Sequence, residues 1–127
     1  MGEHEMKYEV RDIDTPHGKA KGLSAEWENG QYCAILTPKG QVACAIFDLA
    51  VMEAFGMVGA IAKGTPENPL KEPEDLYEAI IVGVTSKALD YGIKEGMSGR
   101  EALLLLLKKG EPTDTGSPEG ISKRQPV

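Results

Sequence analysis

The stretch "QYCAILTPKGQVACAIFD", residues 31–48, decides the fold. Two apolar runs, 31–37 and 41–48, flank Pro38-Lys39-Gly40, a combination that is typical of a tight turn. They predict a β-hairpin with Pro38 at its first corner and Gly40 in the left-handed position of a bulge. Both runs are apolar on both faces, whereas a strand with one face in water alternates apolar with polar residues. We therefore expect both faces to be covered, one by helices and the other by a second subunit.

Two further strands are predicted before this hairpin, over 7–14 and 19–27, with Pro16 and Gly18 in the turn between them. Asn29-Gly30 gives the strongest hairpin signal in the chain. Joined in this order, the four strands form an antiparallel meander.

The remaining elements are helices and one more strand. We expect a short helix over 49–56, a fifth strand over 57–64, a proline-rich loop over 65–73, a helix over 74–91 and a helix over 99–109. The segment "IIVGVT" (80–85) is β-branched and would also suit a strand, but an apolar stripe at helical spacing continues across it and favours helix. The prediction is an α+β fold: an antiparallel sheet, made of the four-strand meander and a fifth strand, with two to three helices packed on one face.

Composition limits the possible functions. One domain is expected over residues 1–110, followed by a disordered tail over 111–127 that is rich in Pro, Gly, Ser and Thr. The net charge of -6 argues against nucleic acid or an anionic membrane as partner, because both require a basic surface. No stretch approaches the roughly 18 apolar residues of a membrane span, and the charged start "MGEHEMKYEV" does not resemble a secretory signal. We expect a cytoplasmic protein with free thiols.

The last predicted helix begins with a recognisable cap. Ser98 and Glu101 form a capping box, in which each side chain bonds the backbone N–H of the other residue. Arg100 is left unexplained, because a cation in the first turn opposes the helix dipole by roughly 0.3–1 kcal/mol. Two interpretations remain open: an ion pair or plain exposure, or a small anionic ligand held by Arg100 and the amides near Gly99. The sequence lacks the lysine and spacing of a P-loop, and no cofactor is predicted.

Five consecutive leucines, Leu103 to Leu107, cover every side of this helix, whereas one amphipathic face needs about a third of the positions. They predict burial on several sides or a contact with another chain. We therefore expect a homo-oligomer.

The thiols and carboxylates suggest little chemistry by themselves. Cys44 and Asp48 would lie about 13 Å apart on a strand, so Asp48 cannot activate Cys44 and is instead predicted to cap the following helix. With a bulge at Gly40, Cys33 falls on the opposite face from Cys44, and no disulfide is expected. His4 and His17 are the only histidines, which leaves no credible metal site.

Three segments, "ACAIFD" (43–48), "ALDYGIKEGM" (88–97) and "SGREALLLL" (98–106), together resemble the YunC-like family of small, uncharacterised archaeal and bacterial proteins. In the family's Cys-Gly-x-Leu-Asp pattern, Cys44 and Asp48 match and Ala45 replaces the glycine. The later pattern matches at Gly92, Ile93, Gly96, Met97, Gly99, Arg100, Glu101, Ala102 and Leu103. The resemblance implies a compact α+β domain in a prokaryotic cytoplasm. It implies no catalytic residue.

Three functions are consistent with these observations. The leading hypothesis is a protein that self-associates and binds a small anion near Gly99 and Arg100. The second is an enzyme with a pocket near the end of the strand 41–48, whose polar groups are Asp48, Arg100 and Cys44. The third is an accessory protein that docks on a larger partner.

Overall fold

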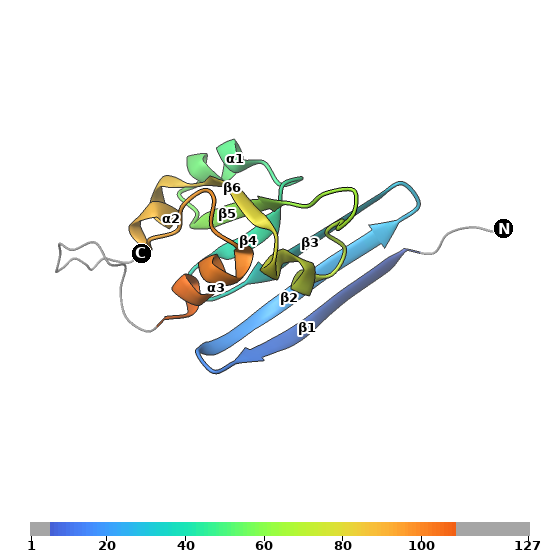
Figure 1. Ribbon diagram of the computed structural model, residues 1–127, viewed down its shortest axis with the longest axis horizontal. Helices are drawn as coiled ribbons and strands as arrows, with labels where there is room; N and C mark the ends of the chain where they lie inside the picture. Colours follow the sequence, from blue (N-terminus) through green and yellow to red (C-terminus); the bar gives the residue numbers. More distant parts are fainter. Residues whose placement is uncertain (1–5, 109–127) are drawn as a thin grey trace.

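The structure, a computed structural model, describes residues 6–108; the predicted tail over 111–127 and the expected helix end at 109 lie outside the described residues. Its elements are β1 (Lys7–Thr15), β2 (Gly18–Trp27), β3 (Gly30–Leu36), β4 (Gln41–Cys44), α1 (Leu49–Ala54), β5 (Gly59–Lys63), the 3₁₀ helix η1 (Pro73–Tyr77), β6 (Ile80–Val84), α2 (Ser86–Asp90) and α3 (Gly99–Leu107). The strands form one six-stranded sheet in the order β1-β2-β3-β4-β5-β6 (Figure 1). The fold is α+β. Among the described residues, no helix is long and apolar enough to cross a membrane.

The first four strands run antiparallel in chain order, which is the predicted meander. The Asn-Gly turn closes the β2–β3 hairpin, with Trp27 opposite Gly30. The rings of Trp27 and Tyr32 then meet edge to face, with centroids 6.0 Å apart. The strand expected over 41–48 is shorter than predicted, because β4 ends at Cys44 and the chain turns before Asp48 begins α1.

The prediction of a purely antiparallel sheet is wrong, because β4 and β5 are parallel. A short helix, α1, lies between these two strands in the chain and returns it to the end from which β4 started. The sheet is therefore mixed, with β6 added antiparallel to β5.

The single helix expected over 74–91 is wrong as well. The segment forms η1, then β6, then α2. The β-branched residues Ile80, Ile81 and Val82 prefer the pleated conformation, in which their stiff side chains pack well. The apolar stripe arose because three separate elements each turn residues such as Leu76, Ile81 and Ala88 toward the core.

Helices cover both faces of the sheet, whereas the prediction had them on one. A Cβ on Gly22 of β2 would lie 2.8 Å from Pro73, which places η1 over this face, and α3 packs against η1. On the opposite face, a Cβ on Gly59 would lie 2.6 Å from Met52 and one on Gly83 would lie 2.8 Å from Leu49, so α1 covers the strands β5 and β6 there.

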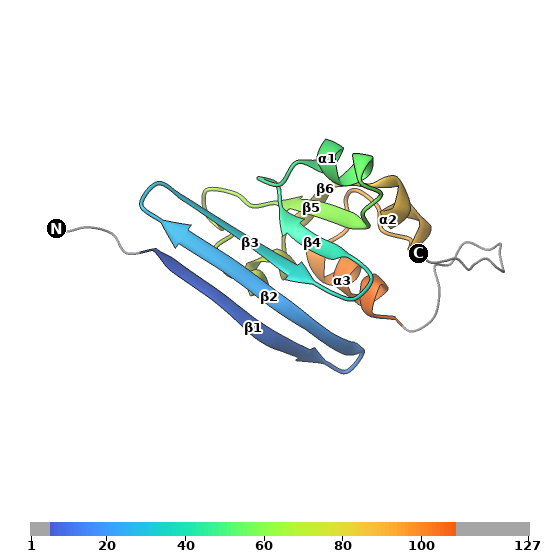
Figure 2. The same cartoon turned by 180° about the vertical axis from the view of Figure 1, so that it is seen from behind.

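On the face that carries α1, no helix lies over β1, β2 and β3 (Figure 2), although Phe47 packs against Tyr32 and Ala34 is fully buried there. Figure 2 shows these three strands from that side, with no helix in front of them. We call this surface the open face. Its side chains alternate with those that point toward η1. Its apolar members are Tyr8, Val10, Leu23, Ala25, Trp27, Tyr32, Ala34 and Leu36. Its charged members near the hairpin turn are Asp12, Asp14, Lys19 and Lys21.

The five leucines of α3 do not require a second chain. Leu103, Leu106 and Leu107 are buried in the core of the same chain, and Leu104 and Leu105 are half-buried. The helix packs against η1, β4 and β6, so several of its sides are covered from within. The leucine run therefore carries no argument for an oligomer.

Gly99 is the closest contact between α3 and η1, and its replacement tests that contact. Gly99→Ala is expected to lower the free energy of unfolding by about 3 kcal/mol, because overpacking has no room to relax here. The new Cβ would lie 1.8 Å from the carbonyl oxygen of Leu76. Urea unfolding measures the loss.

Gly96→Ala is the comparison. Gly96 has a φ of +96° but open space around it, so the same substitution there meets only backbone strain of about 1 kcal/mol. If Gly99→Ala cost no more than Gly96→Ala, the described approach of α3 to Leu76 would be incorrect.

Candidate functional site

Cys33 and Cys44 lie opposite each other on β3 and β4. The strands pair Ala34 with Ala43, so the next position along each places the two cysteines opposite each other. Both thiols are free, and both point toward η1, on the same face as Ile35 and Val42. The prediction that they lie on opposite faces is wrong.

The register differs because the turn contains no bulge. Thr37 donates its hydroxyl to the carbonyl of Gly40 at 2.7 Å and accepts the N–H groups of Lys39 and Gly40 at 3.1 and 3.0 Å. Gly40 is not among the glycines with positive φ, so it does not adopt the left-handed position that the bulge requires. Glycine is required at position 40 because the backbone of Val58 leaves no room for a side chain: a Cβ there would lie 2.5 Å from the carbonyl oxygen of Val58. Thr37, a residue that bonds turn amides well, was the available signal.

The two thiols differ in pKa. The Cys33 thiol is the main cause that lowers the pKa of Cys44, and burial opposes it. The backbone N–H groups of Cys33 and Ile46 also lower this pKa. The pKa of Cys33 is raised, first by the neighbouring Cys44 thiol and then by burial. The pair therefore ionises at Cys44 first, with Cys33 as proton donor.

Asp48 caps α1, as predicted. Its carboxylate accepts the N–H of Ala50 at 2.9 Å and that of Val51 at 3.4 Å. The turn over 45–47 separates it from Cys44, and α1 lies on the opposite face of the sheet from the thiols. A structural role accounts for Asp48.

The start of α3 is likewise explained by the chain itself. Ser98 accepts the N–H of Glu101 at 3.1 Å, and Glu101 accepts the N–H of Ser98 at 3.0 Å, which confirms the predicted capping box. The N–H of Gly99 donates to the carbonyl of Ala79 at 2.9 Å.

Arg100 has two neighbours from the end of η1. Its guanidinium lies 2.8 Å from the Glu78 carboxylate and 4.9 Å from the centre of the Tyr77 ring. Exposed ion pairs contribute up to about 1 kcal/mol, which matches the cost of a cation in the first helical turn. The ion pair that the sequence left open as one interpretation is therefore present.

The four predicted site residues do not converge. Cys44 lies opposite Cys33, and Asp48 accepts hydrogen bonds from amides of α1. The N–H of Gly99 donates to the carbonyl of Ala79, and Arg100 pairs with the carboxylate of Glu78. None of them lines the hollow of about 410 Å³ at the free end of the β1–β2 hairpin.

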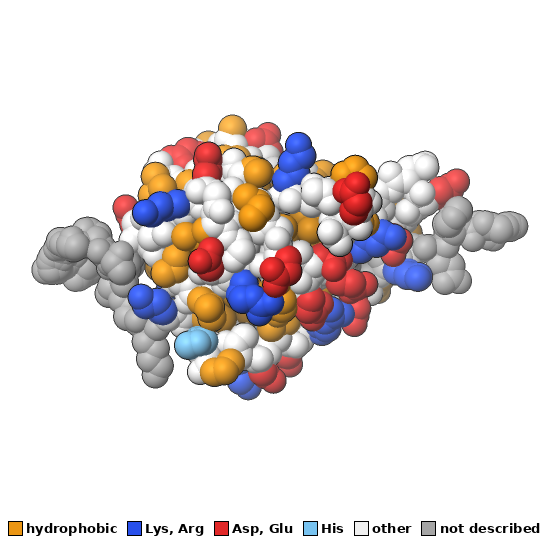
Figure 3. Space-filling view, viewed as in Figure 1, with side chains coloured by type: hydrophobic (Ala, Val, Ile, Leu, Met, Phe, Trp, Pro, Cys, Tyr) orange, Lys and Arg blue, Asp and Glu red, His pale blue; other side chains and the backbone are white. Residues whose placement is uncertain are grey.

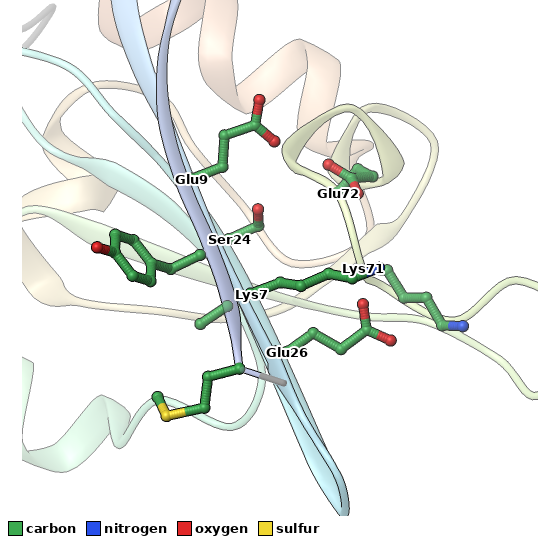
Figure 4. Close-up of a pocket in the computed structure, with 9 residues that line it drawn as sticks. Lys7, Glu9, Ser24, Glu26, Lys71 and Glu72 are labelled. Carbon is green, nitrogen blue, oxygen red and sulfur yellow. The ribbon is translucent and has the colours of Figure 1, made fainter. Parts of the chain in front are cut away.

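Figure 4 shows the polar walls of this hollow: Lys7, Glu9, Ser24 and Glu26 from the hairpin, and Lys71 and Glu72 from the segment before η1. Within residues 6–108, no three His, Cys, Asp or Glu side chains are grouped to hold a metal ion.

Substitution of Asp48 distinguishes a cap from a chemical role. Asp48→Ala is expected to lower the free energy of unfolding by about 1 kcal/mol, because the amides of α1 lose their acceptor. Asp48→Asn is the matched control and is expected to cost only a few tenths, because its amide oxygen still caps the helix. Thermal and urea unfolding measure both. An Asn variant as unstable as the Ala variant would show that the charge, rather than the cap, is required.

Comparison with known proteins places this architecture. Residues 43–106 match the model of a domain of unknown function, DUF1805. The chain is 35% identical over 81 residues to the uncharacterised protein YunC of Bacillus subtilis (strain 168), a match that covers 61% of this chain and 75% of YunC. Its fold matches the crystal structure of a protein of unknown function, TA1206, from Thermoplasma acidophilum, with a TM-score of 0.70. That match has 18% identity and covers 80% of this chain and 94% of the other.

The family match begins at Ala43 within β4 and ends within α3, so it covers the end of β4, the strands β5 and β6, the helices α1, η1 and α2, and nearly all of α3. The predicted segments around Cys44 and Arg100 lie inside it. The chain belongs to the DUF1805 family of uncharacterised YunC-like proteins.

Proposed function

We propose that this protein functions as a homo-oligomer whose subunits meet through the open face of β1, β2 and β3. The observation that carries the proposal is the exposure of apolar side chains on a sheet face that no helix covers. Tyr8 is 79% exposed and Val10 62%. Contiguous apolar surface of this kind marks interaction sites in small proteins.

The two faces of the β1–β2 hairpin differ in polarity along its length. Near the hairpin turn, Ile13 and Ala20 are buried on the face toward η1, and the charged pairs Asp12–Lys21 and Asp14–Lys19 lie on the open face. At the free end the arrangement is reversed. The face toward η1 carries Lys7, Glu9 and Arg11, although part of it is covered. Arg11 bonds Glu72 and Glu74, and acidic and basic side chains gather on this side of the molecule (Figure 3). At this end Tyr8 and Val10 point away from η1 into solvent. A partner on the open face would bury them.

A second copy is the simplest partner. In a two-fold interface the open face of one subunit packs against the open face of the other, so Tyr8 and Val10 of both subunits become buried together. Each such side chain contributes about 1.5–3 kcal/mol when it is fully buried. Asp12 and Asp14 also lie on the open face, opposite Lys21 and Lys19, so the proposed contact centres on the apolar end around Tyr8 and Val10.

The other predicted functions remain proposals with less support. An anion at Gly99 and Arg100 would compete with Glu78 for the guanidinium, so binding there requires that an exposed ion pair open. An enzyme that uses Asp48 would lose the cap of α1. An accessory role would place a larger partner on the same open face, and a purified homo-oligomer would exclude it.

Val10→Glu tests the interface. It is expected to weaken self-association at least about tenfold, because a two-fold contact would bury two added carboxylates. Sedimentation velocity over a range of protein concentrations measures the change. Leu89→Glu is the matched control, because Leu89 is 55% exposed on α2, away from the open face, and its replacement should leave the association unchanged.

Equal effects of the two substitutions would place the interface elsewhere. A wild-type protein that stays monomeric at tens of micromolar would refute the proposal.

A further inference from the structure

The Cys33–Cys44 pair has the geometry of a disulfide that can open and close. Directly opposed residues in antiparallel strands have Cα atoms about 4.5–5.5 Å apart, and disulfides span about 4.4–6.8 Å. The register places the pair one position beyond Ala34 and Ala43, on the same face of the sheet, and both thiols are free. The bond can therefore form without rearrangement of the fold.

The two sulfurs are not equivalent. Cys33 is fully buried within β3, whereas Cys44 ends β4 and is 6% exposed. The chain turns directly after it, and the next two residues, Ala45 and Ile46, are exposed. The backbone N–H of Ile46 lowers the pKa of Cys44, so the turn that opens Cys44 to solvent also favours its thiolate.

The surroundings restrict the oxidant. Apolar residues of the core, among them Ile35 and Val42, share the face with the pair. A sulfur of such low exposure is reached most readily by a small uncharged molecule. Hydrogen peroxide meets this condition.

We propose that Cys33 and Cys44 are a redox-active dithiol that reduces a hydroperoxide, with Cys44 as the attacking sulfur and Cys33 as the resolving one. The Cys44 thiolate attacks one peroxide oxygen, the O–O bond breaks, and the departing oxygen takes a proton to leave as water or an alcohol. Cys44 is then a sulfenic acid. The Cys33 sulfur attacks the Cys44 sulfur, the S–O bond breaks, and a second water leaves with the Cys33 proton.

The overall reaction balances. One dithiol and one hydroperoxide give one intrachain disulfide, one alcohol or water, and one water, and two electrons pass from the sulfurs to the peroxide. A dithiol reductant restores the pair by thiol–disulfide exchange.

The test treats the reduced full-length chain with one equivalent of hydrogen peroxide. Wild type is expected to lose both thiols, to gain a Cys33–Cys44 disulfide by peptide mass spectrometry and to recover both thiols with dithiothreitol. At about pH 6.5, the native thiols should react about tenfold or more faster than those of the urea-unfolded chain, because an ordinary thiol is almost entirely protonated there.

Two variants separate the roles. Cys33→Ala is expected to stop at a Cys44 sulfenic acid that a cyclic diketone traps, and Cys44→Ala is expected to react at less than a tenth of the wild-type rate. Circular dichroism shows whether each variant is folded. If a variant does not fold, the comparison of native with urea-unfolded wild type still tests the proposal. Native thiols that react more slowly than the unfolded ones, or oxidation without the intrachain disulfide, would overturn the proposal.

Discussion

The pairing of β3 with β4 is the constraint on which the rest of this structure depends. Side chains alternate along a strand, so a shift of one residue would move every apolar side chain of β4 to the other face. The four-residue turn closed by Thr37 sets Leu36 opposite Gln41, and this fixes Val42 and Cys44 on the face toward η1. Gln41 and Ala43 then face α1. The same pairing brings the two thiols together.

The unequal cover of the sheet follows from the connections that the strands use. The short helix α1 links two parallel strands, so it can cover only the half of one face that lies over β5 and β6. The meander β1–β3 is joined by tight turns, which supply no covering element. One half of the molecule is therefore a filled core between helices, and the other is a hairpin with an apolar side that lacks a cover. The self-association that we propose would use this second half, and the thiol pair lies beside the first.

Local signals in the sequence predicted local structure well. The Asn-Gly turn, the Asp48 cap and the Ser98–Glu101 capping box were all readable, because each depends on residues within three or four positions of one another. The family resemblance was also correct. The contacts that bring distant segments together were not readable. Nothing near Arg100 indicates that Glu78 would lie beside it, and the strand β6 forms because β5 offers it an edge, against the helical spacing of its own residues. The cysteine pair was missed through one assumption about Gly40.

The β3–β4 register can be measured directly by nuclear Overhauser effects in the isotopically labelled, reduced protein. The account predicts cross-strand contacts between Ala34 and Ala43 and between the Cβ protons of Cys33 and Cys44. Contacts of Ala34 with Cys44 and of Cys33 with Ala45 would contradict it, because that register places the two thiols on opposite faces of the sheet.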